Sequence, residues 1–136
     1  MAEESYDLII VGAGPAGMSA AINARARDKS VAIFESGELA KKIDWAPEIN
    51  NYLGFSNIAG PELAQQFINH IQDLEIPIIR QKVVKAYSMG ETVMLTTNQE
   101  NYEAKKLILA VGVLQEAKLE GEADYVGQGV SYCATC

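Results

Sequence analysis

Two cysteines end the chain, Cys133 and Cys136, in the sequence Cys-Ala-Thr-Cys. Sulfurs at this spacing can close a small disulfide ring, and such surroundings lower one thiol pKa to about 7, which favours the nucleophilic thiolate. Zinc is the main competing use, but a structural zinc site needs four ligands and the chain adds only His70, far away in sequence. A pair of inert buried thiols is a second alternative. The spacing therefore favours a redox-active disulfide.

A second motif with chemical meaning, residues 12–17, reads Gly-Ala-Gly-Pro-Ala-Gly and fits the pattern G-x-G-x-x-G. In this pattern Gly12 makes a tight turn, Gly14 lets a pyrophosphate approach the backbone, and Gly17 lets a helix pack closely on a strand. A helix that begins here offers free N–H groups and the positive end of its dipole to phosphates. A glycine-rich turn that merely packs is the alternative interpretation.

An acidic residue, Glu35, lies at the tip of the strand predicted to follow that helix. Its carboxylate would accept hydrogen bonds from an adenosine ribose and would repel a 2′-phosphate. The first site is therefore predicted to hold FAD or NAD, and not NADP.

These motifs need a scaffold of alternating strands and helices. Apolar runs predict buried parallel strands. Helices are predicted by a segment rich in small residues and by an amphipathic stripe of Leu63, Phe67, Ile71 and Leu74. The first 35 residues are predicted to form a βαβ unit with a right-handed crossover. The expected strands are 6–11, 30–35, 77–80, 82–87, 92–97 and 102–109, and the expected helices run from 14 to about 28 and from 60 to about 75. Residues 36–59 are predicted to be an irregular, functional loop, and residues 113–132 a linker or domain crossing.

Composition excludes several classes of protein. The 136 residues suit one ordinary domain, and the net charge of -7, with no Lys/Arg-rich stretch, argues against binding to nucleic acid. No apolar run approaches the roughly 18 residues needed to cross a membrane. The acidic N-terminus lacks the positive region of a secretory signal, so a cytoplasmic protein is expected.

Taken together, the motifs resemble the low-molecular-weight thioredoxin reductases, within the FAD-dependent pyridine nucleotide-disulfide oxidoreductase superfamily. The resemblance is carried by the glycine motif with Glu35, by Ala110-Val111-Gly112 after the last strand, and by residues 129–136, and it covers essentially the whole chain. It implies an α/β fold, a Rossmann-like FAD-binding three-layer ββα domain whose N-terminal segment is residues 1–113. Residues 114–136 would be the crossing and the start of a second nucleotide-binding domain, the redox-disulfide/pyridine-nucleotide domain.

The resemblance also assigns cofactor contacts. Val83 matches the position whose backbone meets the adenine, and residues 49–55 match a segment beside the flavin, with Leu53 in place of the family's proline. In the loop after Glu35, Glu38 replaces an amide with a negative charge. The implied cofactor-binding residues are Gly12, Gly14, Pro15, Ala16, Gly17, Glu35, Ser36, Gly37, Leu39, Asn51, Val83, Ala110, Val111 and Gly112.

The mechanism implied by the family sends two electrons from reduced FAD to the disulfide. Cys136 would lie next to the flavin, and Cys133 would attack the disulfide of thioredoxin or a similar small protein. The family's usual donor is NADPH, and a homodimer is its usual assembly. The alternatives are a ferredoxin-dependent flavin thioredoxin reductase, a flavoprotein that reduces a peroxiredoxin or glutaredoxin-like partner, and a fragment without enzymatic activity whose cysteines only sense redox state.

Several parts of the usual enzyme lie beyond this sequence. The family's acid just after the second cysteine, its second G-x-G-x-x-G, its nicotinamide site and its returning FAD segment are all missing. These 136 residues alone are therefore expected to bind FAD weakly, not to turn over, and to leave sheet edges and apolar surface uncovered.

Overall fold

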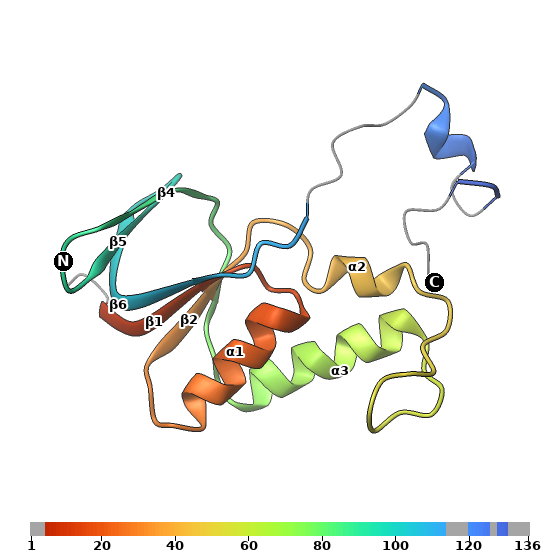
Figure 1. The fold of residues 1–136 in the computed structure, drawn as a ribbon, viewed down its shortest axis with the longest axis horizontal. Helices are drawn as coiled ribbons and strands as arrows, with labels where there is room; N and C mark the ends of the chain where they lie inside the picture. The colour runs from red at the N-terminus through yellow and green to blue at the C-terminus, as the bar shows by residue number, and fades with distance from the viewer. Residues whose placement is uncertain (1–4, 114–119, 126–127, 131–136) are drawn as a thin grey trace.

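The computed structural model describes residues 5–113, 120–125 and 128–130. The first of these ranges contains a six-stranded sheet with helices on one face (Figure 1). Both cysteines therefore lie outside the described residues. The strands are β1 (Ser5–Val11), β2 (Val31–Phe34), β3 (Ile78–Ile79), β4 (Val83–Ser88), β5 (Val93–Thr97) and β6 (Asn101–Leu109). The helices are α1 (Pro15–Arg25), α2 (Lys41–Asp44) and α3 (Gly60–Asp73), followed by a 3₁₀ turn, η1 (Glu122–Tyr125).

The sheet has the order β3-β2-β1-β6-β5-β4. β1 pairs in parallel with both β2 and β6, and β2 pairs in parallel with β3, whereas β4, β5 and β6 form an antiparallel meander. All four residues of β2 are buried, as expected for a parallel strand covered on both faces. The predicted βαβ unit is confirmed as β1, α1 and β2.

One face of the sheet is covered by α1 and α3, which lie side by side in Figure 1. Ile10 and Ile33 of the strands pack there with Met18 of α1 and Ile71 of α3 in one apolar cluster. Helix α1 ends at Arg25, so the prediction that it continues to about residue 28 was wrong. The chain turns there with a left-handed backbone at Asp28 (φ 56°), which a helix cannot continue through.

The opposite face carries a second cluster, which contains Phe34 of β2 and Tyr102 of β6 with their ring centroids 4.8 Å apart. Val83 of β4 packs against the same cluster, although three strands separate β4 from β2 in the sheet order. The sheet must therefore curl, so that the meander covers the face that the helices leave free. This arrangement gives the two β layers and one α layer that the resemblance implied.

The segment between β2 and α3 is more ordered than the sequence indicated. It contains α2, one helical turn that follows a left-handed residue, Ala40 (φ 51°), and two isolated bridges, Ile49 with Ile58 and Tyr52 with Phe55. The prediction that the whole of 36–59 is irregular was therefore wrong. A single turn has too few residues to show helical periodicity in a sequence.

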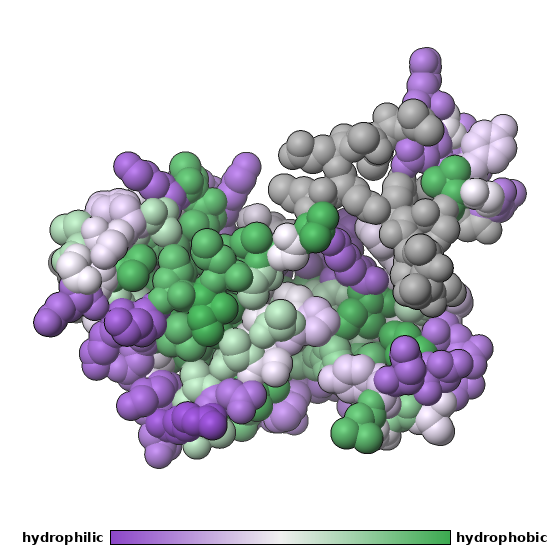
Figure 2. Space-filling view, viewed as in Figure 1, coloured by the Kyte–Doolittle hydropathy of each residue, from purple (hydrophilic) through white to green (hydrophobic). Residues whose placement is uncertain are grey.

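Part of the sheet is left uncovered, as expected. β1 pairs with β6 as far as Leu109, whereas β5 pairs with β6 only as far as Ala104. Within the described residues, no strand covers the other edge of β6 beyond that point, and Leu109 and Val111 are 67% and 65% exposed. Figure 2 shows apolar side chains gathered over the strands on this face. In the same described ranges, no helix is long and apolar enough to cross a membrane.

Candidate dinucleotide site

The glycine motif forms a turn with no space for side chains at two positions. Gly12 has a φ of +110°, and a Cβ there would lie 2.2 Å from the carbonyl oxygen of Ala110. A Cβ on Gly17 would lie 1.9 Å from the carbonyl oxygen of Gly12. Both contacts are with backbone, which cannot move aside, so the turn requires glycine at both positions. The tight-turn and close-packing tasks predicted for these glycines agree with this geometry.

Gly14, the middle glycine of the motif, has open space around it. It is the N-cap of α1 with extended backbone, and a Cβ there would meet nothing within 4 Å. No side chain caps the helix, and Pro15 occupies its first turn. The first N–H groups of a helix lack intrahelical acceptors, so this open, uncapped helix start can donate them to an anion. The geometry fits a dinucleotide pyrophosphate.

The predicted ribose-binding acid, Glu35, lies beside this turn. The backbone N–H of Ala13 donates to its Oε2 at 3.1 Å, and the N–H of Gly37 donates to its Oε1 at 2.8 Å. One carboxylate thus ties the glycine turn to the loop after β2. Each carboxylate oxygen accepts about two hydrogen bonds, so acceptor capacity is left for hydroxyl groups of a ligand.

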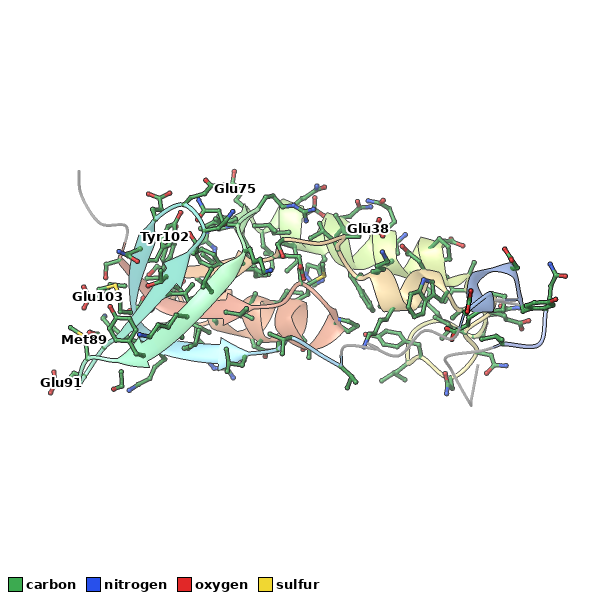
Figure 3. All side chains as sticks on the ribbon, turned by 90° about the horizontal axis from the view of Figure 1, so that it is seen from above. Glu38, Glu75, Met89, Glu91, Tyr102 and Glu103 are labelled. Carbon is green, nitrogen blue, oxygen red and sulfur yellow. The ribbon has the colours of Figure 1, made fainter. Side chains whose placement is uncertain are left out.

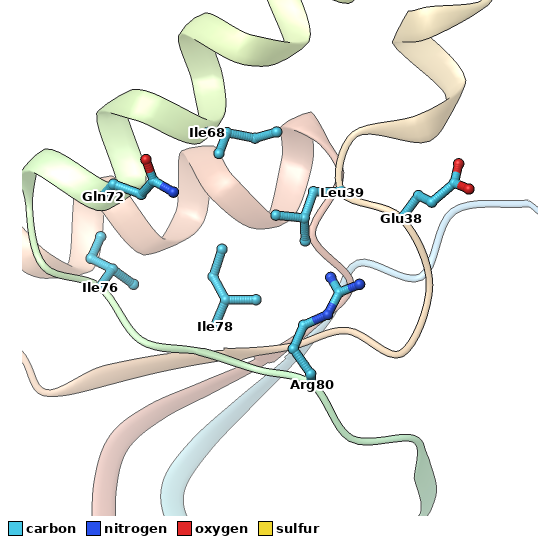
Figure 4. A pocket seen from close by; sticks show the side chains of 7 residues that line it. All are labelled: Glu38, Leu39, Ile68, Gln72, Ile76, Ile78 and Arg80. Carbon is cyan, nitrogen blue, oxygen red and sulfur yellow. The ribbon is translucent and has the colours of Figure 1, made fainter.

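The loop after Glu35 places its residues in different surroundings. Ser36 and Gly37 are exposed, and the carboxylate of Glu38 pairs with Lys41 at 3.2 Å on the surface. The side chain of Leu39 is half-buried in the lining of a pocket of about 570 Å³ between α3 and the edge of the sheet (Figure 4). This pocket is lined by Glu38, Leu39, Ile68, Gln72, Ile76, Ile78 and Arg80, so of the predicted cofactor residues it includes only Leu39.

The end of β6 closes against the glycine turn. The N–H of Ala110 donates to the carbonyl oxygen of Val11 at 2.8 Å, and the carbonyl of Ala110 faces Gly12. Val111 and Gly112 follow on the surface, and Gly112 has a left-handed backbone with φ 68°. Gly12, Gly14, Gly17, Glu35 and Ala110 are therefore brought together at the carboxyl ends of β1, β2 and β6, where open α/β sheets bind ligands.

Two other predicted residues lie on separate elements. Asn51 is exposed in the loop of the Tyr52–Phe55 bridge. Val83 begins β4 and is half-buried against the Phe34 cluster. Figure 3 shows that the β4–β5 turn, with Met89 and Glu91, lies at the opposite end of the sheet from Glu38. His70 is exposed on α3, in agreement with the prediction of a surface or partly buried histidine.

A polar network holds the chain just before Val83. The Thr97 hydroxyl donates to Gln81 Oε1 at 2.6 Å, and the Gln81 side-chain amide donates to Glu100 at 3.2 Å. The Tyr102 hydroxyl also donates to Glu100, at 2.7 Å. These hydrogen bonds, from Tyr102 first and then from Gln81, hold the pKa of the Glu100 carboxyl below its ordinary value.

Sequence reasoning missed a residue at the exit of β6. The ammonium of Lys42 on α2 donates a hydrogen bond to the carbonyl oxygen of Val113, 71 positions away in sequence. The only available signal was the Lys41-Lys42 pair, which does not reveal a distant partner. In the part of the chain that the structure describes, no group of acidic, histidine or cysteine side chains could hold a metal ion.

The comparisons with known proteins agree with this geometry. Residues 6–136 match the family described as pyridine nucleotide-disulphide oxidoreductase. The chain is 37% identical over 134 residues to the thioredoxin reductase of Mycoplasma genitalium and 33% identical over 135 residues to that of Bacillus subtilis. These matches cover 96% and 98% of this chain but only 42% and 43% of the relatives.

Solved structures give the same result. A ferredoxin-flavin thioredoxin reductase from Clostridium acetobutylicum is 49% identical with a TM-score of 0.77, and the match covers 97% of this chain and 46% of that one. The thioredoxin reductase of Streptococcus pyogenes is 37% identical with a TM-score of 0.87, with 99% and 44% covered. The chain thus spans less than half the length of these relatives. The family model matches nearly all of its residues, and the glycine turn, Glu35 and Ala110 converge at one edge of the sheet. This chain therefore belongs to the pyridine nucleotide-disulphide oxidoreductase family.

Proposed function

We propose that this chain is the cofactor-binding part of a flavin-dependent thioredoxin-disulfide reductase. The observation that carries the proposal is the uncapped start of α1 beside the Glu35 carboxylate, in a chain that matches a thioredoxin reductase over 96% of its own length. Thioredoxin as the disulfide partner is taken from the names of these relatives.

The residues of this chain bind and orient the cofactor. FAD, when bound, supplies a two-electron carrier. The N–H groups at the start of α1 would donate to its pyrophosphate, and the open space at Gly14 would let the phosphates approach the backbone. Glu35 would accept from the ribose hydroxyls while it keeps its bonds to Ala13 and Gly37. The backbone of Val83, close in sequence to the Gln81 network, would hold the adenine. The remaining contacts are those named above: Pro15, Ala16, Gly17, Ser36, Leu39, Asn51 and Ala110 to Gly112.

The sulfur chemistry belongs to Cys133 and Cys136. Their disulfide takes up two electrons and two protons and becomes a dithiol. The Cys133 thiolate attacks the partner disulfide and forms a mixed disulfide, and one partner sulfur leaves as a thiol. Cys136 then attacks Cys133, which re-forms the ring and releases the reduced partner. We place the division between the FAD-binding segment and the following domain at residues 113 and 114.

The electron donor separates two versions of the proposal. The identity to the ferredoxin-flavin reductase, 49%, exceeds the 37% to the Streptococcus pyogenes enzyme, and this difference favours reduced ferredoxin. NADPH is the alternative that the family resemblance implies. Anaerobic addition of each donor to the full-length flavoprotein distinguishes the two, because only the true donor bleaches flavin absorbance rapidly. A homodimer, which the resemblance implies, and a cytoplasmic location both stay predictions.

Cysteine variants of the full-length protein test the activity. Cys133→Ser and Cys136→Ser should each abolish thioredoxin reduction and leave FAD bound. The matched variant Thr135→Ser, which keeps both sulfurs, should still reduce thioredoxin. Activity in both cysteine variants would contradict the proposal. Reduction of a peroxiredoxin or glutaredoxin-like partner without reduction of thioredoxin would assign the alternative partner. Absence of any disulfide reduction would favour a redox sensor.

A further inference from the structure

The short helix α2 is fixed at both ends to elements of the dinucleotide site. At its start, the N–H of Ala40 donates to the carbonyl oxygen of Ala13 in the glycine turn, at 3.0 Å. At its end, the N–H of Gly60 donates to the carbonyl oxygen of Ala46, at 2.9 Å. A Cβ on Gly60 would lie 2.0 Å from the carbonyl oxygen of Ile43, so α3 begins in direct backbone contact with α2. Backbone hydrogen bonds at its two ends therefore connect α2 to the glycine turn and to the start of α3.

The two lysines of this helix point to different partners. Lys41 pairs with the exposed carboxylate of Glu38, three residues earlier. Lys42 instead crosses to the far side of the site, where its ammonium donates to the carbonyl oxygen of Val113 and lies 3.8 Å from the position of a Cβ on Gly112. Successive helical residues are rotated by about 100°, which explains why neighbours on one turn serve separate surfaces.

The exit segment, residues 111–113, has little else to hold it. Ala110 makes the last backbone hydrogen bond to β1, and within the described residues Lys42 supplies the only hydrogen bond found for residues 111–113. Val111 and Val113 are exposed, and the left-handed Gly112 lies between them. Glycine accepts many backbone conformations, so the direction in which the chain leaves β6 depends on what holds Val113.

We propose that Lys42 is a positioning residue that fixes the direction in which the chain leaves the dinucleotide site. Val113 and Cys133 are 20 positions apart in sequence, so this direction influences how the redox cysteines approach the cofactor. The influence on the cysteines rests on the proposed function. The hydrogen bond from Lys42 to the Val113 carbonyl oxygen, which forms a bridge between α2 and the exit segment, does not.

The test compares Lys42→Met with Lys41→Met in the full-length flavoprotein. Methionine keeps an apolar stem but removes the charge and the donor. Elastase, which cleaves after small aliphatic residues, should cut after Val111 or Val113 about three- to tenfold faster in Lys42→Met, the factor for losing one exposed charge-assisted hydrogen bond. Lys41→Met should match the wild type, and Lys42→Arg should restore it. Equal cleavage in the two methionine variants would overturn the bridge.

The second readout concerns the sulfur. In the two-electron-reduced protein, the long-wavelength absorbance of a thiolate next to the flavin should decrease in Lys42→Met and return in Lys42→Arg, with FAD affinity within about twofold of wild type. Faster cleavage without a change in this band would overturn the positioning role. If wild-type protein shows neither the band nor disulfide reduction, the proposed function fails, and the elastase comparison still decides whether the bridge exists.

Discussion

The two ends of the dinucleotide site are built in different ways. At the glycine turn, backbone meets backbone so closely that Gly12 and Gly17 leave no space for a Cβ, and Glu35 ties the turn to the next loop. At the exit, Val111 and Val113 are exposed, and Leu53, in the loop that the resemblance assigns to the flavin, is 98% exposed. The end at the glycine turn is therefore closely packed within the described residues, whereas the end at which we propose the flavin ring binds exposes apolar side chains.

This contrast follows from how each end is encoded. A pyrophosphate needs backbone N–H groups and an adenosine ribose needs a carboxylate, and one βαβ unit can supply both from a short stretch of sequence. A site for a planar, largely apolar ring needs surfaces from several directions, and the exposed apolar side chains near β6 are the surfaces that such contacts would cover.

The largest effect is predicted for crowding of the glycine turn. Gly17→Ala places a methyl group against the Gly12 carbonyl and should lower the free energy of unfolding by about 3 kcal/mol or more. Gly14→Ala, at the glycine of the same motif that has open space around it, should change this free energy by no more than about 1 kcal/mol but weaken FAD binding. Urea unfolding and FAD titration of the full-length protein measure both quantities. Equal destabilisation by the two variants would show that the turn is not closely packed.

Removal of the Glu35 charge should come next. Glu35→Gln replaces one oxygen by a donor that faces a backbone N–H, so the dissociation constant of FAD should rise by about tenfold to a hundredfold. Glu38→Gln on the same loop is the control and should change this constant by less than about twofold, since that side chain is exposed and forms a surface ion pair with Lys41. The idea that this carboxylate organises the phosphate-binding end would be refuted by equal constants, measured by flavin fluorescence.

A smaller effect, on the pH dependence of stability, is predicted at the other end of the sheet. The hydrogen bond from Lys105, followed by those from Ser30, lowers the pKa of Asp7 from 3.8 to about 2. The folded-state pKa is depressed, so the stabilisation is complete above about pH 4 and is lost as the pH falls toward 2. Asp7→Asn should therefore weaken the dependence of stability on pH in this window, whereas Glu91→Gln in an exposed turn should not. Acid titration followed by circular dichroism compares the three proteins.

The smallest effect is predicted at the open end. Leu53→Ser should change the free energy of unfolding by less than about 0.5 kcal/mol, because that side chain makes almost no contact within this chain. Ile58→Ala, at a buried position of the same loop, should cost about 2–4 kcal/mol. A large loss of stability in Leu53→Ser, measured by thermal unfolding, would mean that the open end is packed after all.

The parts of the fold that could be predicted from the sequence depend on short-range patterns. The βαβ unit, the glycine turn and α3 are each contained in one stretch of regular hydrophobic spacing with recognisable ends. The position of Glu35 followed from the same unit. The roles of the cysteines stay predictions, since Cys133 and Cys136 lie outside the described residues.

The remainder depends on contacts between distant residues. The bond from Lys42 to Val113 joins positions 71 apart, and the tight packing of Gly60 on Ile43 depends on where α2 lies. Neither contact leaves a local pattern. The curl of the sheet is also non-local, because it arises where Phe34 and Val83, from strands with three others between them in the order, reach one cluster.

Strand β6 pairs with β5 at its beginning and with β1 as far as its end, so it belongs to the meander and to the parallel sheet at once. A strand shared in this way transmits mechanical constraint. Loosening of the meander near Tyr102 would loosen the register that sets Ala110 against the glycine turn. The two β layers should therefore unfold and refold locally as one cooperative unit. A destabilising substitution in the meander would then also destabilise the glycine turn.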